Sequence, residues 1–407
     1  MARIPEILAP AGDMASLQAA LDNGADAIYL GLVSFNMRQG ASRNFSRDTL
    51  PDASARCRAK NVKLYLTLNT LIYEGEFDSM RAELEFAKPF IDAALVADFA
   101  AIQACAALSI PFHISTQMSC ANSAAAKFLA SLGAERIVLA RECSLAEAAA
   151  IAKKIAPVEI ETFVHGAICV AVSGRCLLSH AAYGCSASRG ECRQPCRRRY
   201  LIHEVAEGDG ATAEFQVEPH AVLSARDLCS LPFLDKLAAA GIASFKIEGR
   251  ARNPEYVAAT VRAYKRAVEA IAAGEWSAEL ADALVADCAK VYHREFGFGL
   301  YHGRPGADQM AADDNNRATE KKWHSGIVLH YYPKAAMAQV HIQDRELRIG
   351  DKISIHGPST GVVDLTVESL RRDDEVPAIA ERGNWVTFPC ARPVRPGDKV
   401  FLIEVVS

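Results

Sequence analysis

Hydrophobic and polar positions along the chain repeat as a short apolar run followed by an amphipathic stretch rich in alanine and leucine. The apolar runs carry many β-branched and aromatic residues, which favour strands. Eight of them can be counted, at residues 6–9, 27–32, 63–68, 93–97, 111–115, 136–140, 159–164 and 243–247. The stretches between them, such as SAAAKFLASLG, have helical periodicity, and several end in glycine, as helices commonly do. The pattern therefore indicates repeated βα units.

Repeated βα units of about 30 residues predict a parallel (β/α)8 barrel of the TIM type. A doubly wound parallel sheet is the alternative. That fold normally has fewer strands and a glycine-rich phosphate-binding turn, and the sequence contains no such turn. We therefore expect an α/β barrel over residues 1–305.

The hydrophobic pattern changes to alternating strands and turns near the end of the chain. A long amphipathic helix follows the eighth strand, and a polar, glycine-containing segment precedes the change. The runs SGIVLHYY, MAQVHI, DKISI, VVDLTVESL, NWVTFP and DKVFLIEV each have the features of a strand. We predict a linker at residues 306–322 and a small β-barrel domain at residues 323–407.

Polar residues follow nearly all of the predicted barrel strands. In this fold the carboxyl ends of the strands form the active face. The residues concerned are Asp13, Asn36, Arg38, Asn69, Gln103, Gln117, Arg141, Glu142, His165, Glu248 and Arg250. Any single one could cap a helix or satisfy a loop, but their recurrence indicates a polar mouth. We assign Asn36, Arg38, Asn69, Gln117 and Arg141 to substrate binding, and His165, Glu248 and Arg250 to catalysis.

The connection between the seventh and eighth strands is roughly 75 residues long, whereas such loops usually have a few residues. This insertion, at about residues 165–230, holds five of the 12 cysteines: Cys169, Cys176, Cys185, Cys192 and Cys196. Such a density of thiols indicates metal or iron–sulfur ligation. Zinc and an iron–sulfur cluster both remain open from the spacing, although only Cys192 and Cys196 have a spacing typical of zinc pairs.

Arginines cluster around the last two of these cysteines. The formal net charge of the chain is −4, so any binding to nucleic acid must come from a local patch. The segment from Arg189 to Arg199 is such a patch. We assign Arg193, Arg197, Arg198 and Arg199 to RNA binding.

The remaining features concern compartment and reaction class. The start of the chain lacks a signal peptide, and no apolar run reaches the ~18 residues that span a bilayer, so we expect a cytoplasmic protein without membrane contact. In a reducing compartment, clustered cysteines indicate metal binding or catalysis. The sequence has no H-E-x-x-H or G-x-S-x-G motif. A thiol protease pairing His165 with Cys169 is the hydrolase that remains, against a structural or positioning role for His165.

Five segments carry a resemblance to a known family. EILAPAGD, FVHGAICVAVSGRCLLS, RGECRQPCR, SARDL and SFKIEGR are similar to the signatures of the peptidase U-32, or collagenase-like, family. The strands after Trp323 resemble the C-terminal domain of the branch that hydroxylates the wobble uridine of tRNA.

The resemblance implies a function in RNA modification and a 4Fe-4S cluster. Its four ligands fall by motif on Cys169, Cys176, Cys192 and Cys229, with Cys185 or Cys196 as a replacement for one of them. It further implies tRNA as the partner and prephenate, a small dicarboxylate, as the hydroxyl donor. Arg38, Arg141 and Arg250 are then candidate carboxylate partners. The alternatives are hydroxylation of a cytidine in 23S rRNA, an accessory role in ubiquinone hydroxylation, and peptidase activity.

Overall fold

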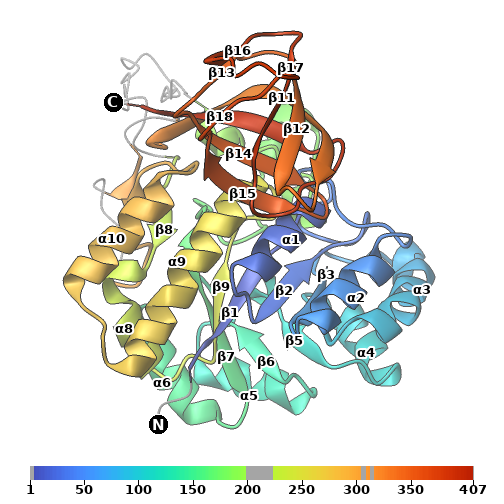
Figure 1. The fold of residues 1–407 in the computed structure, drawn as a ribbon. Coiled ribbons are helices and arrows are strands. Elements are labelled where there is room, and N and C mark those ends of the chain that lie inside the picture. The colour runs from blue at the N-terminus through green and yellow to red at the C-terminus, as the bar shows by residue number, and fades with distance from the viewer. Residues whose placement is uncertain (1–3, 199–222, 304–308, 312–315, 407) are drawn as a thin grey trace, which may run out of the picture.

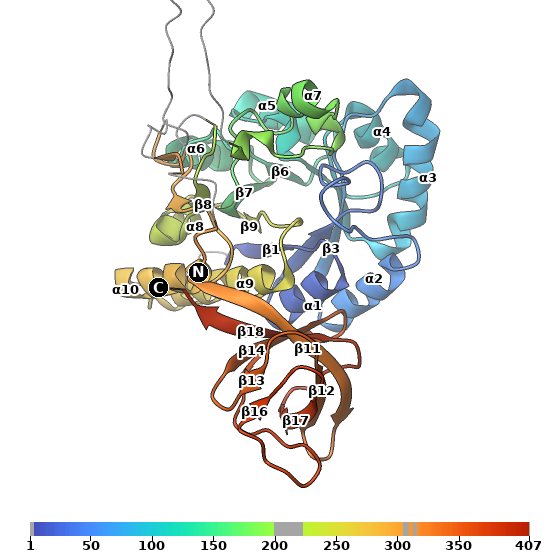
Figure 2. The same ribbon diagram turned by 90° about the horizontal axis from the view of Figure 1, so that it is seen from above.

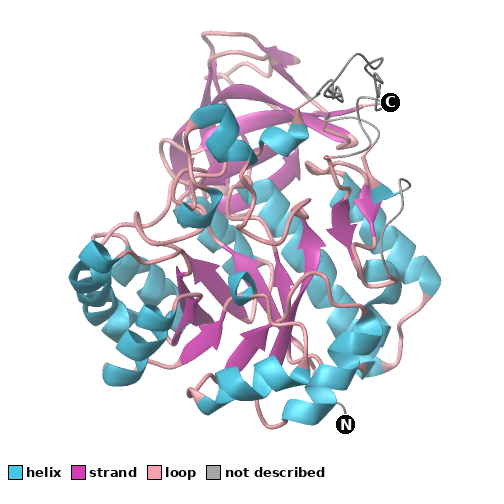
Figure 3. Cartoon of the chain, turned by 180° about the vertical axis from the view of Figure 1, so that it is seen from behind, coloured by secondary structure: helices cyan, strands magenta, loops and turns pink. Residues whose placement is uncertain are grey.

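The computed structural model describes residues 4–198, 223–303, 309–311 and 316–406. Its larger part is a closed barrel of parallel strands surrounded by helices, which confirms the predicted fold class (Figures 1 and 3). The barrel strands are β1 (Glu6–Pro10), β2 (Ala27–Leu30), β3 (Lys63–Leu68), β4 (Ala93–Val96), β5 (Phe112–Ile114), β6 (Arg136–Val138), β7 (Glu159–Gly166) and β9 (Ser244–Ile247).

The barrel closes through β9, which pairs in parallel with both β1 and β7. The β7–β9 register shifts between Phe163 and His165, so alternation between the two faces of β7 breaks there. This closed ring of neighbours rules out the doubly wound alternative, because each of the two edge strands of an open sheet would have a neighbour on one side only.

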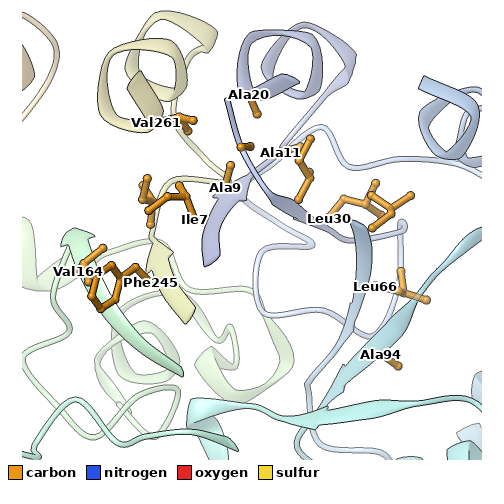
Figure 4. Close-up of a cluster of buried hydrophobic side chains, with 14 of the residues drawn as sticks. Ile7, Ala9, Ala11, Ala20, Leu30, Leu66, Ala94, Val164, Phe245 and Val261 are labelled. Carbon is orange, nitrogen blue, oxygen red and sulfur yellow. The ribbon is translucent and has the colours of Figure 1, made fainter. Parts of the chain in front are cut away.

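Helices cover the outside of the barrel. They are α1 (Met14–Asp22), α2 (Leu50–Ala59), α3 (Phe77–Ala87), α4 (Phe99–Ala107), α5 (Ser123–Ser131), α6 (Leu145–Ile155), α8 (Leu234–Ala239), α9 (Pro254–Ala273) and α10 (Ala278–Ala289). Every second residue of a barrel strand points outward to these helices. Ile7, Ala9 and Phe245 share a buried apolar cluster with Ala20 of α1 and Val261 of α9 (Figure 4). Burial of this layer supplies the main hydrophobic stabilisation of the barrel.

The intervening strand residues point into the barrel, and several of those at its amino-terminal end are charged. Arg136 is buried, and its guanidinium contacts Glu6 at 2.5 Å, Glu159 at 2.6 Å and Glu161 at 3.3 Å. Lys246 contacts Glu161 at 2.8 Å from the level above. We call these five residues the base network. Burial penalises all of these charges, so the network persists only because each one has an opposite partner.

The insertion after β7 contains the short helix α7 (Leu178–Tyr183) and the 3-10 turns η4 (Ala187–Arg189) and η5 (Pro195–Arg197). Two further strands of the barrel sheet were not predicted from the sequence: β8 (Asp227–Cys229) at the end of the insertion, and β10 (Phe296–Gly297) after α10. β8 runs antiparallel to the end of β7, and β10 pairs with β8. The described parts of the insertion lie across one end of the barrel (Figure 2).

The C-terminal part is an antiparallel β-domain. Its strands are β11 (Glu320–Tyr332), β12 (Met337–Ile342), β13 (Leu347–Arg348), β14 (Lys352–Gly357), β15 (Gly361–Thr366), β16 (Ile379–Ala380), β17 (Trp385–Pro389) and β18 (Lys399–Val405). Six of them form one sheet in the order β15-β14-β18-β11-β12-β17, and β13 pairs with β16. The first strand begins at Glu320, inside the predicted linker. The sheet order has two ends, so hydrogen bonds do not close it as a barrel.

The β-domain packs on the outside of the large barrel, away from the insertion (Figure 2). β15 lies against α1, where Gly361 approaches the backbone of Ala19. Arg392 contacts Asp22 at 2.7 Å, and Lys322 contacts Glu255 of α9 at 2.6 Å. In the described part of the chain, no helix combines the length and apolar character needed to cross a membrane.

Candidate functional site

A pocket of about 1040 Å³ opens at the carboxyl ends of the barrel strands, beneath the insertion. We call it the mouth pocket. Its charged lining residues are Arg38, Arg141, Arg197, Lys246, Glu248 and Arg250, and four cysteines of the insertion also line it. A single carboxylate therefore faces five cations among the described lining residues, and the pocket is strongly positive.

Glu248, just past β9, holds the arginines of the mouth pocket together. Its Oε1 accepts hydrogen bonds from Arg38 Nη2 at 2.9 Å and Nε at 3.2 Å, and its Oε2 lies 3.8 Å from Arg141. Burial alone would raise the pKa of Glu248, but Arg38, Arg141 and Arg250 outweigh it and lower the pKa to about 2. Glu248 is therefore ionised at neutral pH, and it neutralises only part of the charge around it.

Arg250 is buried in the wall of the pocket and is fixed from behind. It donates to Thr67 Oγ1 at 2.8 Å and to Asn36 Oδ1 at 2.7 Å. Burial lowers its pKa to about 10, so it stays charged at neutral pH. Gly31 lies directly beneath it, and a Cβ there would overlap the Arg250 guanidinium. Asn36, which we assigned to substrate binding, is fully buried and does not line the pocket, so the structure places it as a support for Arg250.

Lys246 and Tyr29 line the pocket floor and were missed by the sequence analysis. The Lys246 ammonium lies 4.4 Å from the centre of the Tyr29 ring, while its charge is paired with Glu161 below. Strand alternation in the SFKIEGR segment could have identified Lys246. Ser244, Lys246 and Glu248 are two residues apart, so their side chains point into the barrel together.

Asn69, Ser115 and Gln117 form a neutral polar group on another side of the pocket. The backbone N–H of Met37 donates to Asn69 Oδ1 at 3.1 Å. Asn69 Nδ2 donates to Ser115 Oγ at 3.1 Å and reaches Gln117 Oε1 at 3.4 Å, and Ser115 Oγ also donates to Gln117 Oε1. Two of the polar residues that we expected at the barrel mouth lie elsewhere: Asp13 caps α1, and Gln103 is exposed on α4.

The insertion contributes the thiols of the mouth pocket. The four cysteines that line it are Cys169, Cys176, Cys192 and Cys196. Burial raises the pKa of Cys196, the positive charge of Arg197 acts in the opposite direction, and the thiols of Cys169 and Cys192 add to the rise. Cys185 does not line the pocket, and its Sγ lies 3.5 Å from the Tyr183 carbonyl oxygen.

Cys229 does not join these thiols, contrary to our expectation that it converges with Cys169, Cys176 and Cys192. β8 runs antiparallel to β7 and pairs Cys229 with His165, which turns the thiol toward α9. There Tyr264 Oη lies 3.9 Å from Cys229 Sγ, within the apolar layer between barrel and helices. Burial raises its pKa to about 11. Cys196, and not Cys229, lines the pocket together with Cys169, Cys176 and Cys192.

The donor set suits a thiolate-ligated metal group in its chemistry. Four sulfur donors on one pocket wall match the ligand number of a structural zinc ion and of an iron–sulfur cluster, and Arg197 favours the thiolate form. Among residues 4–198, 223–303, 309–311 and 316–406, no three His, Cys, Asp or Glu side chains converge closely enough to hold a single metal ion. The four thiols therefore share a wall without forming a ready-made mononuclear site.

The arginine patch divides into exposed and buried members. Arg193 and Arg198 are exposed, and their guanidinium groups lie 5.5 Å and 5.2 Å from the centre of the Tyr183 ring. Arg197 instead donates to the carbonyls of Ala225 at 2.9 Å and Ile168 at 2.6 Å, so its guanidinium ties the insertion to the barrel. This use leaves Arg197 poorly placed for phosphate contact. Arg199 lies outside the described residues.

His165 faces away from the mouth pocket. Its Nδ1 lies 3.3 Å from Tyr264 Oη, and its ring packs against Tyr256 and Phe296. Burial lowers its pKa to about 3, so the imidazole is neutral. The register shift in β7 is the physical reason for this orientation, which does not support the catalytic role that we assigned to His165.

The chain is similar to a protein named a collagenase and to two proteins named for RNA hydroxylation. It is 37% identical to a collagenase of Porphyromonas gingivalis, over 98% of both chains. It is 31% identical to tRNA hydroxylation protein P1 of Bacillus subtilis, over 97% of this chain and 94% of that one. It is 36% identical to a 23S rRNA 5-hydroxycytidine synthase of Escherichia coli, over 65% of this chain and 39% of that one.

The family comparison covers most of the barrel. The model of peptidase family U32 matches residues 12–311, which include every barrel strand after β1 and the whole insertion. The chain belongs to peptidase family U32.

Proposed function

We propose that this protein hydroxylates a pyrimidine in RNA, with the wobble uridine of tRNA as the favoured target and a small dicarboxylate such as prephenate as hydroxyl donor. The observation that carries the proposal is the mouth pocket, where four thiols and a surplus of buried positive charge face the same space. Relatives named for tRNA hydroxylation and for 5-hydroxycytidine synthesis in rRNA support the reaction class.

The cations of the mouth pocket suit a carboxylate ligand. Arg141 donates to the carbonyl of Ala167 at 2.6 Å and stacks over Phe163, so its guanidinium is held in place before any ligand arrives. Arg38 is fixed in a similar way by Glu248. A guanidinium held in this manner can grip both oxygens of a carboxylate with little loss of entropy. Arg38, Arg141 and Arg250 would therefore bind and orient the dicarboxylate.

Cys169, Cys176, Cys192 and Cys196 would hold the metal group, which we propose is a 4Fe-4S cluster. When bound, such a cluster supplies one-electron redox chemistry. The residues of the chain bind the two substrates beside it, and the insertion covers them. Glu248 stays ionised in the pocket, and it fixes Arg38 rather than donating a proton at neutral pH.

RNA would reach the pocket across the insertion. Arg193 and Arg198 are exposed beside the Tyr183 ring, and cations beside an aromatic ring suit phosphate contact combined with base stacking. Arg175 belongs to the same insertion and is also exposed, and it forms no ion pair with another described residue. These three arginines, rather than Arg197, are the candidates for phosphate contact.

Peptidase activity is the second candidate, because one of the similar proteins is named a collagenase. A thiol protease needs a general base within hydrogen-bond reach of its cysteine. Among the described residues, no histidine lines the mouth pocket, and the side chain of His165 faces α9 instead. His180 lines a neighbouring pocket together with Cys176, but no hydrogen bond joins their side chains in the described part of the chain, and Cys176 Sγ accepts from the Leu178 N–H at 3.4 Å. The geometry therefore favours RNA hydroxylation.

The test measures iron, acid-labile sulfide and zinc in single cysteine variants that are reconstituted without oxygen. Cys196→Ala should lose most of the iron, while Cys229→Ala should keep it. Cys185→Ala is the matched control, because this cysteine lies in the insertion but outside the pocket. Nucleosides of tRNA and rRNA from a deletion strain would show which RNA loses its hydroxyl group. Stoichiometric zinc without iron, or unchanged nucleosides together with gelatin cleavage by the loaded protein, would overturn the proposal.

A further inference from the structure

A second pocket, of about 1180 Å³, adjoins the mouth pocket, and we call it the side pocket. The two pockets share a wall that includes Met37, Asn69, Gln117 and Cys176. The lining of the side pocket differs from that of the mouth pocket, because it has no buried cation among its described residues. Its walls include Leu71, Met118 and Leu177, and the Leu177 side chain is 76% exposed at the rim. Such walls suit the faces of an uncharged planar ring and do not suit a dicarboxylate.

The only charged side chain among its described lining residues is that of Arg175, which is exposed at the rim. A cation at the rim of an apolar pocket fits a nucleotide, because the base enters while the phosphate stays outside. Leu177, beside Arg175, is a large apolar side chain placed to cover a ring that enters the pocket.

Gln117 presents a hydrogen-bond donor to this space, and its neighbours fix which end of its amide does so. The Met37 N–H can only donate, so Asn69 accepts it through Oδ1 and turns its Nδ2 toward Gln117. Gln117 must then meet Asn69 Nδ2 and Ser115 Oγ with its oxygen. Its Nε2 has no hydrogen-bond acceptor among the described residues, and it faces the cavities.

We propose that the side pocket binds the extruded target pyrimidine and that the fixed Gln117 amide donor selects uridine over cytidine. This inference rests on the proposed function. Hydroxylation at C5 requires that edge of the ring to face the mouth pocket, so the neighbouring C4 group lies at the shared wall with Gln117. Uracil carries an acceptor oxygen at C4, whereas cytosine carries an amino group that can only donate. Two donors facing each other would leave both unpaired, and this costs affinity for cytidine.

The test compares binding of two fluorescent anticodon stem-loop RNAs to the full-length, cluster-loaded protein. The RNAs are identical except for uridine or cytidine at the wobble position, and affinities come from anaerobic anisotropy titrations. Wild-type protein should bind the uridine RNA about tenfold more tightly. Gln117→Glu replaces the donor with an acceptor but can still accept from Ser115 and Asn69. It should shift the affinity ratio toward cytidine by about tenfold or more.

Gln103→Glu makes the same change of charge on the exposed face of α4, and it should leave the ratio unchanged. Gln117→Met removes both donor and acceptor, so it should abolish the preference without reversing it. Thermal melting checks that each variant is folded. An unchanged ratio in both Gln117 variants, with normal uridine binding by the wild-type protein, would sink the inference while the proposed function stands. If the wild-type protein binds neither RNA, the proposed function fails first and the inference fails with it.

Discussion

The two ends of the barrel bury charges in opposite proportion. At the base, Arg136 and Lys246 face Glu6, Glu159 and Glu161, so acids outnumber cations and every cation has a close partner. At the mouth, Glu248 is the single acid among the described lining residues, against four arginines. Charges that satisfy each other stabilise a fold without binding anything, whereas a surplus of one sign requires a ligand or solvent. The comparison assigns stability to the base and anion binding to the mouth.

The largest effect should follow from breaking the base network. Arg136→Met leaves Glu6, Glu159 and Glu161 buried without their shared cation, and it should lower the free energy of unfolding by about 3–5 kcal/mol. Urea denaturation measures this. Arg81→Met removes an exposed arginine that pairs with Glu85 one turn away, and its cost should stay near 0.3–0.5 kcal/mol. Similar losses for the two variants would contradict a stabilising role for the base.

Glu248 should make the free energy of unfolding depend on pH in the acidic range. Its pKa of about 2 in the folded protein lies below the ordinary glutamate value of about 4.3. The folded state therefore gains stability above pH ~4.3, and this gain is lost as the pH falls toward 2, up to about 2–3 kcal/mol. Unfolding free energies at several acidic pH values should fall less steeply for Glu248→Gln than for the wild type. Parallel curves for the two proteins would show that the arginines do not hold this carboxylate.

The smallest effect concerns ligand affinity at the mouth. Arg141→Gln removes one of the fixed guanidinium groups, so prephenate should bind about tenfold more weakly. Isothermal titration calorimetry of the cluster-loaded protein measures this affinity. Arg81→Gln serves as the control, because that side chain is exposed on α3. Equal affinity in the wild type and Arg141→Gln would remove the dicarboxylate from this part of the pocket.

The fold followed from the sequence because its signal is periodic and long. Each barrel strand is an apolar run that alternates with a helix, and β1 to β7 and β9 all lie within or beside the predicted runs. β8 and β10 were missed because they lie outside the repeated alternation of apolar run and helix, whereas the equally short β5 and β6 lie within it. The six strands of the larger sheet in the β-domain were predicted, whereas β13 and β16 were not. Closure of the sheet depends on long-range pairing that no local pattern reports.

The charged lining of the mouth pocket was predictable where a side chain closely follows a strand, as for Arg141 after β6 and Glu248 after β9. It was not predictable where orientation depends on pairing between distant segments. Cys229 is the clearest case, because the antiparallel course of β8 turns its thiol toward Tyr264. Asn36 lies after a strand as expected, but burial behind Arg250 makes it a support. Arg197 sits in an arginine run, yet carbonyl groups of the barrel engage its guanidinium.

Gly31 shows how a position without a functional group can control the charge of a site. Any side chain there would displace the Arg250 guanidinium from Thr67 and Asn36. In a mutational library, substitutions at Gly31 should be as poorly tolerated as substitutions of the arginine itself. Methods that rank positions by reactive chemistry would pass over Gly31, whereas methods that rank them by the volume they tolerate would place it beside Arg250. Redesign of the mouth pocket therefore has to keep or change Gly31 and Arg250 together.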